Sequence, residues 1–268
     1  MSLELPTSLT PSKVSAFTTC AMAFRFSQID RLPEPPSPHA AKGTLVHRVL
    51  ELLHWHQPQG KRTLETALTY LPRAVSEVLD GPEYIDLRLS DNERGEFVDD
   101  AQVLIANAFA LEDPNDARIL GVELRLEVTI GTLKLRGIID RLEIAPDGAL
   151  VVTDYKTGRA PGQLYEQTKL GGVHFYALLC EEVIGRRPDR VQLLHLREPI
   201  AIIAEPSEQS TRGQSRRASA IWTAVEKACE REDFRPRPSK LCDWCNFKEF
   251  CPAFGGNPGT IPVAAATA

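Results

Sequence analysis

Three consecutive stretches in the middle of the chain constrain the fold most, because each is rich in β-branched residues and alternates in polarity. They span residues 119–130, 133–144 and 149–156, and this pattern predicts β-strands. The connection at Gly131–Thr132 is short enough for a hairpin. In the next connection, Pro146 presets one dihedral and Gly148 permits a positive φ, as a turn requires. We therefore expect three neighbouring strands in one sheet.

Helical patterns surround these strands. Apolar residues recur at three-to-four spacing, and we expect helices at residues 40–56, 62–79, 91–111, 164–184 and 211–231. Two further strands are expected at residues 190–197 and 200–205. This order of elements predicts an α/β fold class with a mixed central sheet flanked by helices.

Two carboxylates and a lysine stand at the ends of apolar runs in the expected sheet. Asp154 and Lys156 are two residues apart on one strand and share a face. Asp140 follows the apolar run Gly137–Ile139 on the neighbouring strand, so Asp140 and Asp154 can converge. Converging carboxylates bind Mg²⁺, which polarises a phosphoryl oxygen and lowers the pKa of bound water. Taken alone, the same residues also fit a solvated Asp–Lys pair.

The helix expected over residues 40–56 supplies another candidate ligand. Within its segment GTLVHRVLE, His47 and Glu51 are four residues apart and share a face. A lone helical histidine is usually structural or exposed, but imidazole is also a good ligand for Mn²⁺. His47 is therefore a candidate ligand of the same metal ion.

Together, the segments GTLVHRVLE, GIIDR and DYKTG resemble the RecB-family branch of the PD-(D/E)XK nucleases. The resemblance covers most of the chain and implies a restriction-endonuclease-like core. It implies that His47, Asp140 and Asp154 bind Mg²⁺ or Mn²⁺, and that Lys156 assists catalysis. It also implies that the backbone carbonyl of Tyr155 contacts the metal.

The chain departs from this family pattern at one position. The family has a Gln-x-x-x-Tyr motif on the helix after D-x-K. Tyr176 fits the tyrosine and is a candidate DNA contact, but Gly172 stands where glutamine is expected. Gln167 and Lys169 lie nearby and could substitute. Tyr176 also fits a core residue, since its helical neighbours are apolar.

Four of the six cysteines form a ligand pattern. Three are clustered near the C-terminus and one lies far upstream: Cys242, Cys245, Cys251 and Cys20. Four thiolates suit either tetrahedral Zn²⁺ or a 4Fe–4S cluster, and the spacing alone leaves both open. The pattern resembles the AddB nuclease domain and CRISPR-associated exonucleases, which implies a 4Fe–4S cluster. We expect Cys180 and Cys229 to be ordinary buried thiols.

A link between these cysteines would pin the N-terminal segment to the C-terminal one. We therefore expect a single nuclease domain over residues 1–254, with a core at about 40–205. Residues 12–30 and 234–254 would form its iron–sulfur region, and residues 255–268 a flexible tail.

The net charge of −5 and the pI of about 5.8 argue against a protein that coats nucleic acid along its whole surface. Arginine pairs bidentately with phosphate, and Arg141 and Arg25 are the candidate DNA contacts. The N-terminal residues show no signal peptide, and no apolar stretch approaches the ~18 residues of a membrane span. We therefore expect a soluble, cytoplasmic protein without a membrane partner.

The resemblance implies a Mg²⁺- or Mn²⁺-dependent deoxyribonuclease, with exonuclease action on single-stranded DNA or DNA ends in repair or recombination. The sequence has no Walker loop, so any unwinding would come from a helicase or repair partner. One alternative is an iron–sulfur DNA-binding subunit of a larger helicase–nuclease or integration complex. Another is a metal-dependent hydrolase of a non-nucleic substrate.

Overall fold

The computed structural model describes residues 3–160 and 166–261, with the backbone alone at 166–171. The chain divides into two compact units. The first unit comprises Met1–Pro35, Glu127–Arg136 and Arg212–Ala268, and the second comprises Pro36–Leu126 and Gly137–Thr211. Both segments of the expected iron–sulfur region thus fall in the first unit. Residues 262–268 of the expected tail lie outside the described residues.

The chain forms a five-stranded sheet whose strands follow one another in chain order, and all of it except Glu127–Arg136 belongs to the second unit. The strands are β1 (Arg118–Ile130), β2 (Leu133–Ile144), β3 (Leu150–Lys156), β4 (Arg190–His195) and β5 (Ile200–Ala204). β3 pairs antiparallel with β2 and parallel with β4, so the sheet is mixed. The parallel pair needs a crossover, which contains α7 (Glu166–Ile184). The predicted start of this helix at Leu164 lies outside the described residues.

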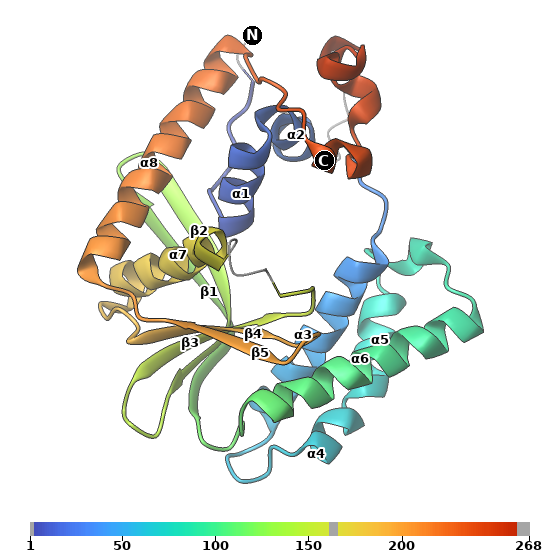
Figure 1. Cartoon of the computed structure of the whole chain (residues 1–268), viewed down its shortest axis with the longest axis vertical. Helices are drawn as coiled ribbons and strands as arrows, with labels where there is room; N and C mark the ends of the chain where they lie inside the picture. Colours follow the sequence, from blue (N-terminus) through green and yellow to red (C-terminus); the bar gives the residue numbers. More distant parts are fainter. Residues whose placement is uncertain (1–2, 161–165, 262–268) are drawn as a thin grey trace. The chain divides into compact units, whose positions relative to one another are not determined.

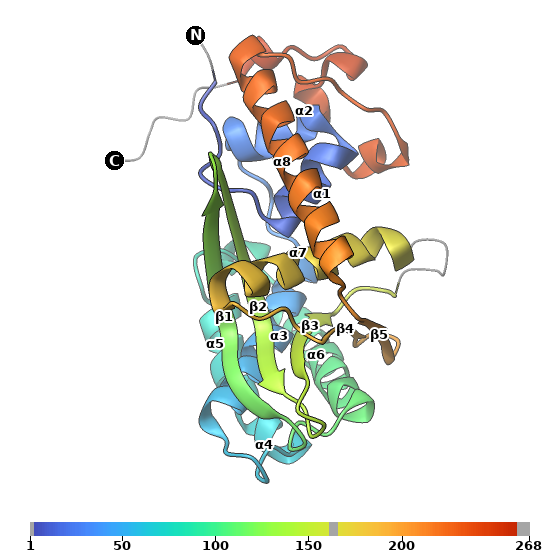
Figure 2. The same cartoon turned by 90° about the vertical axis from the view of Figure 1, so that its left-hand side faces the viewer.

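Helices cover both faces of this sheet (Figures 1 and 2). One face carries α3 (Pro38–His56), α4 (Leu64–Thr69), α5 (Leu71–Leu79) and α6 (Asp91–Leu111). Their apolar side chains form one buried cluster with Tyr155, Leu194 and Leu196 from the sheet. α7 crosses the opposite face. This arrangement confirms the predicted α/β class with a mixed sheet flanked by helices.

The helix predicted over residues 62–79 is in fact two helices, α4 and α5, which meet at Tyr70. Pro72 lies in the first turn of α5. Proline has no backbone N–H to donate to the carbonyl four residues earlier, and its ring collides with that carbonyl. A continuous helix through this position is therefore disfavoured. A short 3₁₀ turn at Ile85–Leu87 then leads towards α6.

The first unit brings together segments from both ends of the chain. It holds α1 (Pro11–Thr19), α2 (Ala21–Phe24), a π-helical turn (Arg25–Ile29), most of α8 (Glu208–Arg231) and 3₁₀ turns at Lys240–Trp244, Lys248–Phe250, Pro252–Phe254 and Pro258–Thr260. Phe26 is fully buried, and its ring lies 5.7 Å from that of Phe247. The N-terminal and C-terminal segments therefore share one small core.

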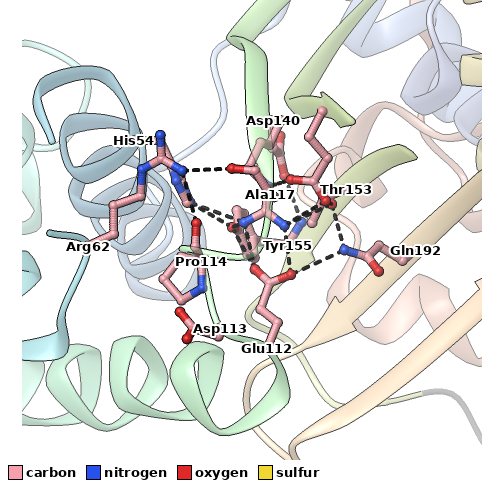
Figure 3. A network of polar contacts seen from close by, with 12 residues as sticks. His54, Arg62, Glu112, Asp113, Pro114, Ala117, Asp140, Thr153, Tyr155 and Gln192 are labelled. Atoms are coloured by element: carbon pink, nitrogen blue, oxygen red, sulfur yellow. Dashed lines mark hydrogen bonds and ion pairs between the residues drawn. The ribbon is translucent and has the colours of Figure 1, made fainter. Parts of the chain in front are cut away.

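A buried ion network joins the sheet to the helices of the second unit (Figure 3). The guanidinium of Arg141 on β2 binds both carboxylate oxygens of Glu112, at 2.6 and 2.7 Å. It also donates to the hydroxyl of Tyr155 at 2.6 Å and forms an ion pair with Glu143. The prediction that Arg141 contacts DNA is wrong, because this side chain has no exposed surface and faces other partners.

His54 on α3 completes the network as a neutral ring. Its Nε2 lies 3.1 Å from a guanidinium nitrogen of Arg141 and 3.2 Å from the hydroxyl of Tyr155. Burial, reinforced by the charge of Arg141, lowers the pKa of His54 to about 2. The imidazole therefore stays uncharged at neutral pH and can accept a hydrogen bond from the guanidinium.

We predict that Arg141→Ala strongly destabilises the protein, because Glu112 and Glu143 lose the countercharge of a buried network. Breaking a buried ion pair from one side costs about 3–5 kcal/mol. Urea unfolding at pH 7, followed by circular dichroism, measures this loss. The matched control is Arg190→Ala, whose guanidinium pairs with the exposed carboxylate of Asp147 at 2.7 Å. Such surface pairs contribute up to about 1 kcal/mol, so equal losses in both variants would contradict this role for Arg141.

Candidate metal centre

The side chain of Asp140 links β2 to β3 just beyond the point where their backbone pairing ends. The last backbone pair at this end is Arg141 with Thr153. The next contact is made by a side chain, because the N–H of Tyr155 donates to Oδ2 of Asp140 at 2.7 Å. The carboxylate of Asp140 is thereby fixed beside β3 and is 11 % exposed.

His47 reaches the same point from α3. Its Nε2 lies 3.0 Å from the backbone carbonyl oxygen of Tyr155, and its Nδ1 lies 3.5 Å from Oδ2 of Asp140. Burial opposes a charge on this ring, but the carboxylates of Asp140 and Asp154 outweigh it and raise the pKa of His47. The structure thus brings His47, Asp140 and the Tyr155 carbonyl together.

Gly43 explains how α3 comes so close to the end of β3. A Cβ atom at this position would lie 3.2 Å from the hydroxyl oxygen of Thr157, tighter than most real Cβ contacts. Gly43 precedes His47 by four residues, about one helical turn. The absence of a side chain at Gly43 therefore lets the histidine approach the strand.

Glu123 on β1 is a further member of the site, and sequence reasoning missed it. His47, Glu123 and Asp140 offer ligand atoms within 4.8 Å of one another, and no other group of this kind is found among the described residues. Glu123 has a φ of 46°, in the left-handed region that non-glycine residues disfavour. Burial, followed by repulsion from Asp140, raises the pKa of Glu123 to about 7.

Asp154 lies outside this group of three but is electrostatically coupled to it. Its buried carboxylate pairs with Nζ of Lys156 and accepts a hydrogen bond from the hydroxyl of Tyr176 at 3.3 Å. Burial and repulsion from Asp140 raise the pKa of Asp154, although Lys156 opposes the shift. The side chain of Lys156 is 45 % exposed.

Tyr176 reaches Asp154 because α7 packs closely on β2. A Cβ atom at Gly137 would lie only 2.6 Å from Leu179 of α7, so this close approach needs glycine. One turn before Tyr176, a Cβ atom at Gly172 would meet nothing within 4 Å. There is thus room for a larger side chain where glutamine was expected. The side chains of Gln167 and Lys169 lie outside the described residues.

The donor set fits a hard divalent cation. It comprises carboxylates and one imidazole, which suit Mg²⁺ and Mn²⁺. The carboxylates of Glu123, Asp140 and Asp154 are gathered in a largely buried place, where they repel one another. His47 and the N–H of Tyr155 lower the pKa of Asp140 despite its burial, so this carboxylate is ionised at neutral pH. A bound cation would relieve the remaining repulsion.

Arg25, the other arginine predicted to contact DNA, belongs to the first unit. Its Nε lies 3.0 Å from a carboxylate oxygen of Asp30, and its side chain is 14 % exposed. A DNA contact by Arg25 would have to compete with this ion pair, and it stays a prediction.

The four predicted cluster ligands line one pocket of the first unit: Cys20, Cys242, Cys245 and Cys251. Backbone N–H groups point at two of the sulfur atoms, from Arg237 to Cys20 and from Ser239 to Cys242, both at 3.4 Å. Burial and the three neighbouring thiols raise the pKa of Cys251. Cys20 and Arg237, which are 217 positions apart in the sequence, thus line the same pocket.

Within residues 3–160 and 166–261, no helix combines the length and apolar character needed to cross a membrane.

Comparisons with known proteins relate this chain to phage proteins and to solved structures. The Gene 69 protein of Mycobacterium phage D29 is 25 % identical over 91 % of this chain and 96 % of its own length. The Gene 69 protein of Mycobacterium phage L5 is 23 % identical over 91 % and 95 %. A "Putative exonuclease" from Eubacterium rectale superimposes with a TM-score of 0.52 and 11 % identity, covering 89 % of this chain and 86 % of that protein. At this identity the superposition supports the fold alone.

Residues 8–252 match the family description of the PD-(D/E)XK nuclease superfamily. The match includes α3, the whole sheet and all four clustered cysteines. The chain therefore belongs to the PD-(D/E)XK nuclease superfamily.

Proposed function

We propose that this protein is a Mg²⁺- or Mn²⁺-dependent deoxyribonuclease that degrades single-stranded DNA from its ends. The observation that carries the proposal is the convergence of His47, Glu123 and Asp140 within 4.8 Å, beside the Asp154–Lys156 pair. Exonuclease action is supported by the resemblance to RecB-family nucleases. The Eubacterium rectale protein, whose fold is similar, also carries the name of an exonuclease.

Different residues of the centre would bind the cation and stabilise the transition state. His47, Asp140 and Glu123 would hold the cation, with Asp154 and the carbonyl of Tyr155 as further ligands. A divalent cation, when bound, polarises the scissile phosphate and lowers the pKa of a bound water. Lys156 can release Asp154 and place its ammonium group beside the negative charge that develops in the transition state.

Tyr155 and Tyr176 position the acidic groups without reacting. The N–H of Tyr155 donates to Asp140, and the hydroxyl of Tyr176 donates to Asp154. Each hydrogen bond restricts a carboxylate to one orientation, which lowers the reorganisation needed when the cation and the DNA bind. In this account Tyr176 acts on the site through Asp154, in addition to any contact with DNA.

We predict that Asp154→Asn abolishes Mn²⁺-dependent cleavage of end-labelled single-stranded DNA, because it removes the charge of a ligand carboxylate.

Lys156→Ala should slow cleavage by about 10²–10³-fold, the usual effect of losing one group that stabilises transition-state charge. Glu123→Gln should raise the Mn²⁺ concentration for half-maximal cleavage by at least about tenfold.

The matched control is Asp147→Asn, which neutralises an exposed carboxylate in the turn between β2 and β3. It should cleave like the wild type. Comparable cleavage by Asp154→Asn and Asp147→Asn would overturn the assignment of the centre. Circular single-stranded DNA separates the two modes of cleavage, because an exonuclease leaves a circle intact while an endonuclease opens it.

We further propose that the four clustered cysteines hold a 4Fe–4S cluster with a structural role. Thiolates around Zn²⁺ lie about 3.8 Å apart, given Zn–S bonds of about 2.3 Å in tetrahedral geometry. Among the described residues, no three cysteine sulfurs lie within 4.8 Å of one another, although all four line one pocket. This wider spacing suits a larger group. The N–H groups directed at Cys20 and Cys242 suit thiolate ligands.

Anaerobic purification should yield a brown protein with about four iron atoms per chain, as a 4Fe–4S cluster requires. Cys20→Ser should lose both iron and colour. Cys180→Ser should retain both, because Cys180 is buried in α7 and lies outside the cysteine pocket. Iron content and the visible absorption spectrum measure the outcome. A colourless protein with one zinc per chain would contradict the cluster and leave the nuclease centre unaffected.

The proposed setting is DNA repair or recombination in the cytoplasm, together with a helicase or repair partner. The chain has no Walker loop that would bind a nucleotide for unwinding. An enzyme that needs single strands would therefore depend on another protein, or on damaged DNA, to expose them.

A further inference from the structure

A basic cavity lies in the second unit beside the metal centre, and none of its lining residues belongs to that centre. It has a volume of about 370 Å³ and is lined by His39, Lys42, Thr157, Gly158, Arg159 and Arg197. These residues come from three separate segments: the first turns of α3, the loop that follows β3, and the turn between β4 and β5. The fold therefore gathers cationic side chains that are far apart in the sequence.

The cavity adjoins the metal centre through two shared elements. Lys42 precedes His47 by five residues on α3, which corresponds to a rise of about 7.5 Å along the helix. Thr157 directly follows Lys156 at the end of β3. The cavity and the centre therefore share α3 and the end of β3, so a bound strand can contact both.

The cations of this cavity are held in place and are only partly neutralised. Lys42 and Arg197 share a single carboxylate, that of Asp100, with Arg197 at 3.3 Å. The ammonium of Lys42 also lies over the ring of Phe97, 5.3 Å from its centre. Two fixed cations around one carboxylate leave a net positive charge that faces the cavity.

Arg159 adds a third cation, which is exposed and has no ion-pair partner among residues 3–160 and 166–261. The nearby carboxylate of Glu198 accepts a hydrogen bond from the backbone N–H of Ala160, at 3.2 Å. The three cationic side chains of Lys42, Arg159 and Arg197 thus outnumber the two nearby carboxylates, which belong to Asp100 and Glu198. The remaining charge is positive before any contribution from His39.

This chemistry suits a phosphate group. Arginine presents paired N–H donors that match two phosphate oxygens, and the hydroxyl of Thr157 offers a further donor. Gly158 has no side chain, so a ligand can approach its backbone closely. We propose that the cavity binds a phosphate of the DNA strand close to the bond that is cleaved. This inference rests on the proposed nuclease function and adds a substrate subsite to it.

The test measures DNA binding separately from cleavage. Fluorescence anisotropy with labelled single-stranded oligonucleotides in EDTA reports affinity when no metal is present to allow cleavage. The variants are Arg159→Gln, Arg197→Gln and their combination. Arg94→Gln is the matched control, because this arginine is also partly exposed and paired with one carboxylate, that of Asp80 at 3.0 Å.

The double variant should bind single strands at least about tenfold more weakly than the wild type, since each hydrogen bond to a charged group contributes substantially. The salt dependence of log K should become shallower by about 0.7 for each phosphate that the variant no longer neutralises. In Mn²⁺, KM should rise while kcat stays within about twofold, because these arginines bind the strand away from the reacting atoms. Arg94→Gln should match the wild type in every measurement.

Oligonucleotides with a 5′-phosphate, a 3′-phosphate or no terminal phosphate identify the source of the bound group. A preference for one phosphorylated end that disappears in the double variant assigns the cavity to a terminal phosphate. An equal weakening of binding on all three assigns it to an internal phosphodiester. Both outcomes support the proposal. A double variant that matches Arg94→Gln in affinity and in salt dependence overturns it.

The same measurements separate this proposal from the nuclease assignment. If the wild type binds DNA through these arginines but does not cleave it in Mn²⁺, the nuclease proposal fails and the phosphate site stands. If the wild type cleaves DNA and the double variant keeps its KM and affinity, the phosphate site fails and the nuclease proposal stands. A wild type that neither binds nor cleaves DNA overturns both.

Discussion

The buried guanidinium of Arg141 is the interaction on which the metal centre depends. It binds Glu112 at the end of α6 and the hydroxyl of Tyr155 on β3, and so ties the helical layer to the sheet. The backbone of Tyr155 in turn contacts the centre, since its N–H donates to Asp140 and its carbonyl faces His47. A charge buried this deeply is tolerated only when its hydrogen bonds are made. The geometry of the centre is thus anchored to a network that must form as a whole.

The two ends of Tyr155 contact different groups of charges. The phenol end contacts the guanidinium of Arg141 and the carboxylate of Glu112, while the backbone end contacts Asp140 and His47. Asp140 repels both Glu123 and Asp154, and burial, followed by this repulsion, raises the pKa of Glu123 to about 7. A divalent cation would relieve this repulsion, which is consistent with the proposed metal site. The basic cavity beyond Lys156 continues the same surface with positive charge, which suits a polyanionic strand.

The sequence predicted the features that depend on local pattern. Alternating polarity and β-branched residues located the strands, and the positions of Asp140 and Asp154 at the ends of apolar runs on neighbouring strands indicated that they would converge. Glu123 could not be found in this way, because its place in the site depends on a positive φ within a strand that otherwise alternates regularly. The burial of Arg141 depends on Glu112, which belongs to another element, so its neighbour Asp140 wrongly suggested a DNA contact. The basic cavity depends on three distant segments, and no local pattern marks it.

Anomalous diffraction from crystals of the protein soaked in Mn²⁺ would show directly where the metal binds. We expect one strong peak among the side chains of His47, Glu123 and Asp140. The peak should be absent from crystals of the Asp140→Asn variant grown and soaked in the same way. A peak at other residues, or no peak when Mn²⁺ is in large excess, would contradict the assignment of this site as the metal centre of the nuclease.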